Sequence, residues 1–436
     1  MGGYIKRLRQ SIGVLGKVYI TILAVIFGGI VLQAPISVGL GALLPQYDVL
    51  IKSWAEILML VAGILAIIIL GQNRQMKILK EPLMVGIWIY VAIYVFSAAL
   101  LGGHISSVAA GLAIDLRYIL FFVLVYIALR LYPQYRHLFI CAGIAGALVV
   151  MIFALLQVFI LPADVLKYIG YNANTIAPYL TVDQNQSFIR INSTLRGPNP
   201  LGAYAGIVIA LLLTYWFRAK RGTFTRPVLP AVVLLVGSLV AIWVSYSRSA
   251  LIGAAIAVVI ILLVTLSQKI SRQVWIIGAI VILAVIGGLL AAGKSTFISN
   301  VFLHENPVTG SSMNSNQGHL SSLKTGVVQM VTQPLGAGVG STGSASLHTS
   351  APLIIENQYL FTAHEAGWLG LVFFLMIFIG VMSRLWQRRS DWMALGVFAS
   401  GIGLAFIGLL LPVWVDDTVA IVWWGLAAIA IGGRHE

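Results

Sequence analysis

Charged residues are scarce in this chain of 436 residues, of which only 9% are Asp, Glu, Lys or Arg. Soluble domains are about 25% charged, whereas 60% of this sequence is hydrophobic. Mean hydropathy is +0.98, and apolar runs long enough for a helix to cross a bilayer recur from end to end. The composition excludes a soluble enzyme or carrier and indicates an integral membrane protein.

Cysteine is almost absent, and metal-ligand spacings are absent too. Cys141 is the only cysteine and lies in an apolar run, which excludes an internal disulfide and a site built from several thiolates. The seven histidines are scattered without a spacing such as His-x3-His. We therefore predict no metal site.

Acidic residues are few, with 13 Asp and Glu against 27 Lys and Arg and a formal net charge of +14. This excess does not indicate a nucleic-acid partner, because the basic residues collect in short alternating loops, the pattern of cytoplasmic loops in membrane proteins. These residues are Lys6, Arg7, Arg9, Arg74, Lys77, Lys80, Arg218, Lys220, Arg221, Arg226, Lys269, Arg272, Arg384, Arg388 and Arg389. The expected surroundings are membrane lipid.

We predict an all-α, polytopic membrane protein of about 12 transmembrane helices, organised as a single transmembrane unit over residues 1–436. Both termini are expected in the cytoplasm. The basic start and first apolar run lack a small-x-small cleavage site, so they are interpreted as a retained helix. The expected spans are 14–34, 51–70, 85–102, 108–131, 138–161, 201–219, 227–245, 250–267, 273–292, 357–383, 392–412 and 417–432.

The longest polar interval, residues 292–367, is predicted to be an extracytoplasmic loop that carries the chemistry. It concentrates histidines, glutamates and a glycine-rich stretch in a chain that is otherwise apolar. Within it, residues 316–333 place Leu320, Leu323 and Val327 at helical spacing. We therefore expect an amphipathic helix that lies on the membrane surface.

Three arginines on the predicted outer side run against the positive-inside pattern and are candidates for binding a diphosphate. Arg248 is expected at a helix N-terminus, where its guanidinium, the free N–H groups and nearby serines suit an anion. Arg190 and Arg196 flank a polar run, and Asn199 is expected to cap the helix that follows. The alternative for each arginine is a snorkelling or headgroup contact.

Glu356 is the residue expected to act as the catalytic base, with His319 as a second catalytic group. A carboxylate near cations can take a proton from a sugar hydroxyl, and Glu356 follows an apolar run where a charge is costly. The alternative is a Glu at a helix N-terminus, which the dipole favours. His319 could donate to phosphate or act as an acid, or only pack or cap. His364 is the next candidate base.

Two further features leave their roles open. Asp115 and Arg117 lie inside one predicted span, two residues apart, so they face different neighbours. Such charges can mark function or an interhelical network. The stretch Gly338-Val-Gly340-Ser-Thr-Gly343 matches G-x-G-x-x-G, but no βαβ unit surrounds it. We expect tight turns there, with backbone N–H groups near phosphate, and no nucleotide site.

Four motifs resemble the O-antigen ligase and O-antigen polymerase superfamily, bacterial membrane glycosyltransferases of the GT-C type. They are RGPNPLGAYAG (196–206), SYSRSALIG (245–253), PLGAGVG (334–340) and ENQYLFTAHEAGWLGL (356–371). The resemblance implies an undecaprenyl-diphosphate-linked glycan donor and a glycan or glycolipid acceptor. It also implies transfer on the outer face of the bacterial plasma (inner) membrane, without a cofactor.

Residue by residue, the resemblance implies that Arg248 holds the diphosphate and that Glu356 stands where ligases commonly have the His of a His-Asn pair. His319 occupies a position where many members have arginine. Asn199, Asn357, His364 and Arg117 are expected to support the site.

The Glu-Asn form is more similar to polysaccharide polymerases than to lipopolysaccharide ligases. An O-antigen ligase acting on lipid A-core is the alternative. A transporter or flippase of the same lipid is the alternative from another class, and it would place its site near the bilayer midplane.

Overall fold

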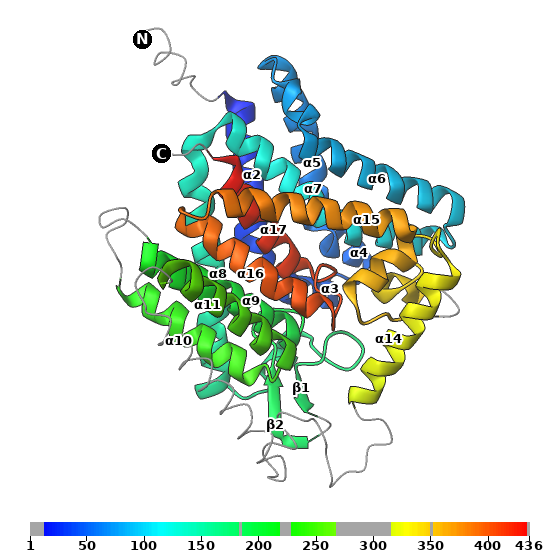
Figure 1. Cartoon of the computed structure of the whole chain (residues 1–436). Coiled ribbons are helices and arrows are strands. Elements are labelled where there is room, and N and C mark those ends of the chain that lie inside the picture. The colour runs from blue at the N-terminus through cyan, green and yellow to red at the C-terminus, as the bar shows by residue number, and fades with distance from the viewer. Residues whose placement is uncertain (1–12, 183–184, 219–227, 267–314, 349–351, 434–436) are drawn as a thin grey trace.

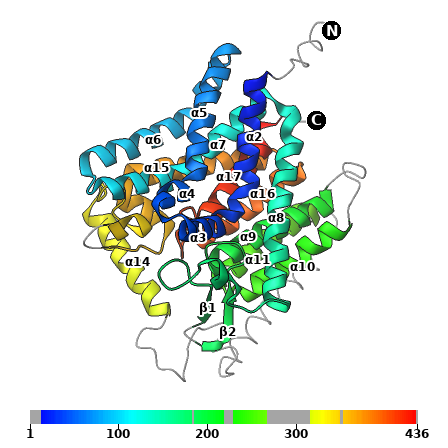
Figure 2. The same cartoon turned by 180° about the vertical axis from the view of Figure 1, so that it is seen from behind.

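The computed structural model describes residues 13–182, 185–218, 228–266, 315–348 and 352–433, and these form a nearly all-α bundle, as predicted (Figures 1 and 2). Within them, eight helices are long and apolar enough to cross a membrane, and three are shorter apolar helices. Eleven of the predicted spans correspond to these helices. The predicted span 273–292 and the loop residues 292–314 lie outside the described residues.

The long elements follow the hydropathy pattern closely. Helix α2 (Val14–Gly29) continues through a short turn into α3 (Gln33–Leu43). The other long apolar helices are α5 (Trp54–Gln72), α6 (Pro82–Leu101), α7 (Ile105–Leu131), α8 (Arg136–Phe159), α9 (Pro198–Arg218), α11 (Arg248–Leu266) and α15 (Gln358–Gln387). The shorter elements are α4 (Asp48–Lys52), α10 (Val228–Val244), α14 (Ser315–Thr332), η8 (Gly343–His348), α16 (Trp392–Gly408) and α17 (Asp417–Gly432).

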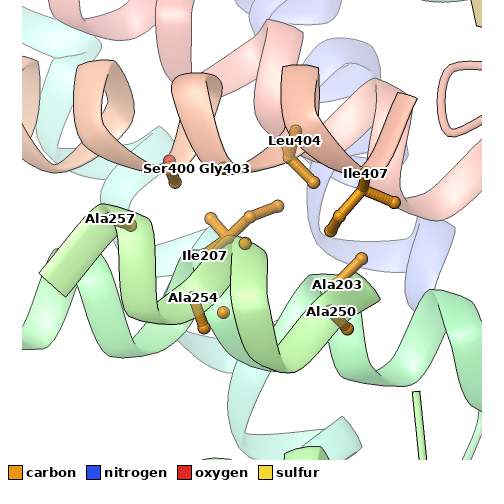
Figure 3. A pocket seen from close by; sticks show the side chains of 11 residues that line it. Ala203, Ile207, Ala250, Ala254, Ala257, Ser400, Gly403, Leu404 and Ile407 are labelled. Carbon is orange, nitrogen blue, oxygen red and sulfur yellow. The ribbon is translucent and has the colours of Figure 1, made fainter. Parts of the chain in front are cut away.

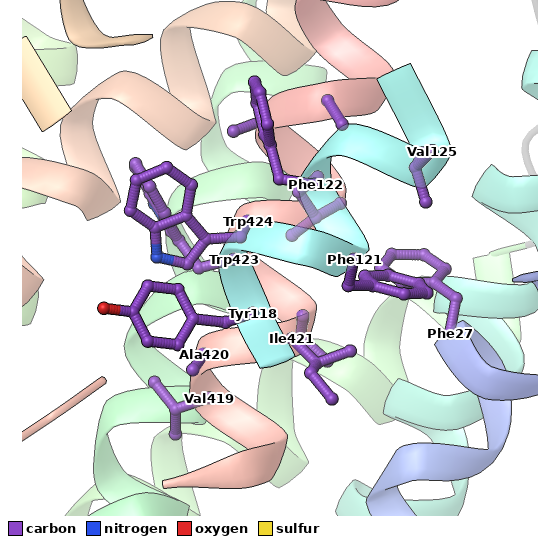
Figure 4. Packing of buried hydrophobic residues seen from close by; sticks show 14 of the residues in the cluster. Phe27, Tyr118, Phe121, Phe122, Val125, Val419, Ala420, Ile421, Trp423 and Trp424 are labelled. Atoms are coloured by element: carbon purple, nitrogen blue, oxygen red, sulfur yellow. The ribbon is translucent and has the colours of Figure 1, made fainter. Parts of the chain in front are cut away.

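Helix α17 is buried along its whole length and packs against α7 at the centre of the bundle. Aromatic side chains fill this contact, and Figure 4 shows them between the two helices. The ring centroids of Tyr118 and Trp424 are 5.5 Å apart, and those of Trp423 and Trp424 are 5.2 Å apart. Because lipid is as apolar as these side chains, close packing and not hydrophobicity stabilises such contacts.

Small residues let α9, α11 and α16 approach one another closely. A Cβ on Gly403 would lie 2.3 Å from the carbonyl oxygen of Gly253, so the backbones of α16 and α11 touch there. The crevice between the three helices, drawn in Figure 3, has a volume of about 10 Å³. That is room for about one water molecule, so this crevice is a packing seam and not a substrate site.

A two-stranded antiparallel hairpin interrupts the helical pattern between α8 and α9. Strands β1 (Tyr179–Val182) and β2 (Asn185–Ile191) pair with Tyr179 opposite Ile191. No strand was predicted in this segment, because the polar start of β2 conceals the alternation of a strand. The hairpin packs against α8 and α10.

Helix α15 is broken at Gly367, where the sequence predicted one continuous span from residue 357. Gly367 has φ 68° and ψ −173°, a conformation that only glycine adopts without strain. The cause is the preceding loop: the carbonyl oxygen of Pro334 accepts a hydrogen bond of 3.0 Å from the Trp368 N–H. A Cβ on Gly367 would lie 2.7 Å from that oxygen.

The basic loops make their polar contacts at one end of the bundle. At one end Arg218 donates to the carbonyl oxygens of Arg389, at 3.1 Å, and Val264, at 3.2 Å. Arg136 forms an ion pair of 2.9 Å with Asp391 at the same end. The hairpin and α14 lie at the other end, in the lower part of Figure 1. Which of the two ends faces outward stays a prediction from the basic loops.

We predict that the α14 end faces outward. In a Cys141→Ser background, a cysteine at the exposed position Lys324 should react with a membrane-impermeant maleimide in intact cells or spheroplasts. A cysteine at the exposed position Lys77 should react only after permeabilisation. Labelling of Lys77→Cys alone in intact cells would invert the topology.

Candidate active site

Helix α14 lies against the segment that leads into α15. His319, Ser322 and Gly326 share one face of the helix, since they are three and four residues apart. The Ser322 hydroxyl accepts a hydrogen bond of 2.8 Å from the Glu356 N–H and donates one of 3.2 Å to the carbonyl oxygen of Ile354. A Cβ on Gly326 would lie 3.0 Å from Leu360. Helix α14 therefore holds residues 354–360 in place.

Another side of α14 is apolar and is not covered by any of the described residues. These exposed residues are Leu320, Leu323, Val327, Val328 and Val331. An apolar stripe on a surface helix at the end of a membrane bundle is suited to the lipid interface. The predicted amphipathic helix is therefore present with the apolar face that the spacing indicated.

His319 and Glu356 form the central polar pair of this end. Nδ1 of His319 lies 2.5 Å from Oε2 of Glu356, and the two side chains are 38% and 34% exposed. Both remain accessible to a substrate while they contact each other. Glu356 precedes α15, which begins at Gln358, one residue after the predicted start of the span at 357. Its carboxylate still lies near the positive end of the helix dipole.

Asn357 is the N-cap of α15. Its Oδ1 accepts hydrogen bonds from the N–H groups of Tyr359, at 2.9 Å, and Leu360, at 3.0 Å. Its Nδ2 donates to the carbonyl oxygen of Leu409 at 2.8 Å, which links α15 to the end of α16. Asn357 supports the site by fixing where α15 begins, directly after Glu356.

Arg190 connects the hairpin to the turn that carries Arg248. Its Nε donates to the carbonyl oxygen of Ser245 at 2.8 Å, and its Nη2 donates to Oδ1 of Asn199 at 2.7 Å. Asn199 is the second residue of α9, which begins at Pro198, so the predicted capping role of Asn199 is wrong. Pro198 is favoured at the first helical position because it lacks an N–H.

Arg248 is the first residue of α11, as the sequence predicted. The hydroxyls of Ser247 and Ser249 lie 3.3 Å apart beside it, and the Ser247 N–H donates to Oγ of Ser245 at 3.2 Å. The turn therefore places a half-buried guanidinium, two hydroxyls and a helix N-terminus together. This is a suitable arrangement for an anion.

Arg117 lies in a network between helices. It forms an ion pair of 3.3 Å with Glu56 of α5 and donates at 2.7 Å to the carbonyl oxygen of Val415. Asp115, two residues away on α7, interacts instead with Glu365 of α15. The expectation that the two residues have separate partners is confirmed.

Asp416 is a carboxyl at this end that the sequence analysis missed. It caps α17 by accepting from the Val419 N–H at 2.9 Å. Burial, and then the neighbouring carboxylate of Asp417, raise the pKa of Asp416 to about 7, although the hydrogen bond from the Val419 N–H and then Arg117 and the exposed Arg196 oppose the rise. The sequence signal that could have identified Asp416 is its position next to Asp417 at the start of an apolar run.

The connection between α16 and α17, residues 409–416, joins these groups. Asn357 bonds to Leu409 at its start. Gln358 then accepts a hydrogen bond of 2.8 Å from the Trp414 N–H. Arg117 bonds to Val415. One short loop thus runs from the residues beside Glu356 to the surroundings of Arg196.

The glycine-rich stretch forms tight turns, as predicted. Gly336, Gly338, Gly340 and Gly343 all have positive φ, between 66° and 97°. Its N–H groups are directed at a protein carboxylate, because the Gly340 N–H donates to Oε1 of Glu365 at 3.1 Å. The predicted proximity of these groups to phosphate is replaced by this internal contact.

His364 is buried, with 3% of its surface exposed, in the first part of α15. Its carbonyl oxygen accepts a hydrogen bond of 2.6 Å from the Ala337 N–H, so it packs under the glycine-rich turn. The structure therefore brings His319, and not His364, into contact with Glu356.

These features define a polytopic membrane protein with a His–Glu pair and an arginine-bearing helix start at one end of the bundle. Residues 233–375 match the family model described as O-antigen ligase. The matched segment includes Arg248, His319 and Glu356, and it supports the O-antigen ligase/polymerase family. The resemblance predicted from the motifs is confirmed. No curated protein sequence matches the chain.

Replacing Asn357 tests its role as a cap. Asn357→Ala should lower the free energy of unfolding by about 1 kcal/mol or more, because it leaves two helix N–H groups and the Leu409 carbonyl without partners. Asn357→Ser can still cap and should lose less. Thermal unfolding of the purified variants in detergent measures both, and equal midpoints for Ala and wild type would contradict the capping role.

Proposed function

We propose that the protein is a polysaccharide polymerase/ligase-type glycosyltransferase on the outer face of the plasma membrane. It transfers a glycan from undecaprenyl diphosphate to an acceptor sugar hydroxyl. The observation that carries the proposal is the His319–Glu356 contact of 2.5 Å at the bundle end, within the segment that matches the O-antigen ligase model.

The reaction is a single displacement that inverts the anomeric carbon and needs no metal. Glu356 accepts the proton of the acceptor hydroxyl as its oxygen attacks the anomeric carbon of the donor. The bond from that carbon to the diphosphate breaks, and undecaprenyl diphosphate leaves with the electron pair. His319 orients the carboxylate, and its exposure of 38% lets the proton pass on to solvent.

Charge on the departing diphosphate is stabilised by arginines. Arg248 stands at the N-terminus of α11 with serine hydroxyls beside it, and groups already in place for developing charge lower the barrier most. Arg196 is exposed at the same end of the bundle and adds a second cation. Arg190 supports this side by holding the hairpin against the Ser245 turn.

Two alternatives differ in what they require of the structure. An O-antigen ligase would use the same groups on a lipid A-core or other non-polymer acceptor, and the description of the matching family favours keeping it as the second candidate. A transporter would need an open polar site near the midplane. Within the described helices, Arg117 is instead paired with Glu56.

Glu356 variants test the proposal in an assay with purified donor and acceptor. Glu356→Gln keeps the shape but cannot accept a proton, so turnover should fall by roughly 10²–10⁴. Donor binding should survive, because the proposed diphosphate contacts are Arg196 and Arg248. Glu356→His should recover part of the rate and lose it at a pH low enough to protonate the new imidazole.

Full turnover of Glu356→Gln would move the base elsewhere. Loss of donor binding together with turnover would make Glu356 a structural residue at the start of α15. Gln72→Glu, at an exposed glutamine remote from this end, serves as the control and should behave as wild type.

A further inference from the structure

Two carboxyl groups inside the bundle have no part in the reaction proposed above. Asp115 of α7 is 4% exposed and Glu365 of α15 is fully buried. An isolated charge at such depth is costly, and buried carboxyls must be neutral, paired or hydrogen-bonded. The groups around Asp115 and Glu365 must therefore stabilise any negative charge that the pair carries.

Of the two carboxyl groups, Glu365 receives hydrogen bonds from backbone N–H groups. Oε1 of Glu365 accepts from the N–H groups of Gly340, at 3.1 Å, and Thr342, at 3.4 Å. Oδ2 of Asp115 and Oε2 of Glu365 have no hydrogen-bond partner among the described residues. The two carboxyl groups nevertheless lie close enough to interact with each other. Two adjacent carboxylates repel each other in a buried site, so we expect one of the two groups to hold a proton.

We propose that Asp115 and Glu365 share one proton and together form a latch that fixes the glycine-rich turn to α7 and α15. The shared proton supplies the missing donor and leaves a single negative charge on the pair. The Gly340 and Thr342 N–H groups stabilise that charge from the turn. Glu365 is thus a positioning residue, and it does not touch the substrate.

The turn is seated tightly enough for such a latch to matter. A Cβ on Gly340 would lie 2.3 Å from the carbonyl oxygen of Ser107, and one on Gly338 would lie 2.4 Å from that of Leu101. The turn therefore rests directly on the end of α6 and the start of α7. Ser97 of α6 adds a hydrogen bond of 2.8 Å to the carbonyl oxygen of Glu365.

The latch reaches Glu356 through the backbone. The Thr342 hydroxyl donates to the carbonyl oxygen of Leu353 at 3.0 Å and accepts from the Ile355 N–H at 3.3 Å. The Gly343 N–H also donates to Leu353, at 2.9 Å. Ile355 is fully buried and is followed directly by Glu356. This part of the inference rests on the proposed role of Glu356 as base.

A matched pair of substitutions separates acceptor chemistry from shape. Glu365→Gln keeps an acceptor for Gly340 and Thr342 and can donate to Asp115. Glu365→Met has a similar length but no acceptor oxygen. In the full-length protein in nanodiscs, backbone hydrogen exchange at Gly340, Thr342 and Ile355 should be at least ten-fold faster in the Met variant and near wild type in the Gln variant.

Turnover and donor binding complete this test. The Met variant should lose at least ten-fold in kcat while its affinity for the lipid-linked donor stays unchanged, and the Gln variant should keep most of its kcat. Unchanged exchange in the Met variant would overturn the latch. Faster exchange with unchanged kcat would overturn its coupling to Glu356. Because exchange needs no reaction, the latch can be judged even if Glu356 proves not to be the base.

Infrared spectroscopy tests the shared proton itself. The wild type should show the C=O stretch of a protonated carboxyl that is lost in both Asp115→Asn and Glu365→Gln, because either amide can donate to the remaining carboxylate. Loss in only one of the two variants would place the proton on a single residue and contradict sharing. Neither variant changes Glu356, so this result is independent of the reaction mechanism.

Discussion

The contact between two backbone segments, at Gly336 and at Gly367, is the constraint on which this end of the molecule depends. A Cβ on Gly336 would lie 2.7 Å from the Gly367 nitrogen, so neither position has room for a side chain. The contact breaks α15 and brings the glycine-rich turn against its first part. That arrangement sets Glu365 under the turn and leaves Glu356 outside, facing α14.

The packing contacts and the candidate catalytic residues lie in different parts of the bundle. Aromatic side chains between α7 and α17 and small residues between α9, α11 and α16 use dispersion and close approach, the interactions that remain effective in lipid. Within the described helices, Arg117 is paired with Glu56. The half-exposed pair of His319 and Glu356 stands at the end of the bundle instead. A reaction at the membrane surface fits this division better than passage through the bundle.

The sequence could predict those features that depend on local pattern. Apolar length predicted eleven described helices, helical spacing predicted α14, and Arg248 was correctly placed at the start of α11. Features that depend on tertiary contacts were missed. Pro198 begins α9 and removes the capping role expected of Asn199, while Gly367 breaks α15 because a distant loop approaches it. Glu365 was overlooked because its interacting groups lie on other elements, whereas the adjacent acids Asp416 and Asp417 were visible in the sequence.

The most direct measurement supplies purified protein in liposomes with an undecaprenyl-diphosphate-linked glycan and an acceptor glycan, and follows the lipid and the sugar separately. Glycosyl transfer predicts that the donor disappears, that undecaprenyl diphosphate accumulates in equal amount, and that the new glycosidic bond has the inverted anomeric configuration. Donor that crosses the bilayer with its sugar still attached would contradict the account, and so would a product that retains the configuration.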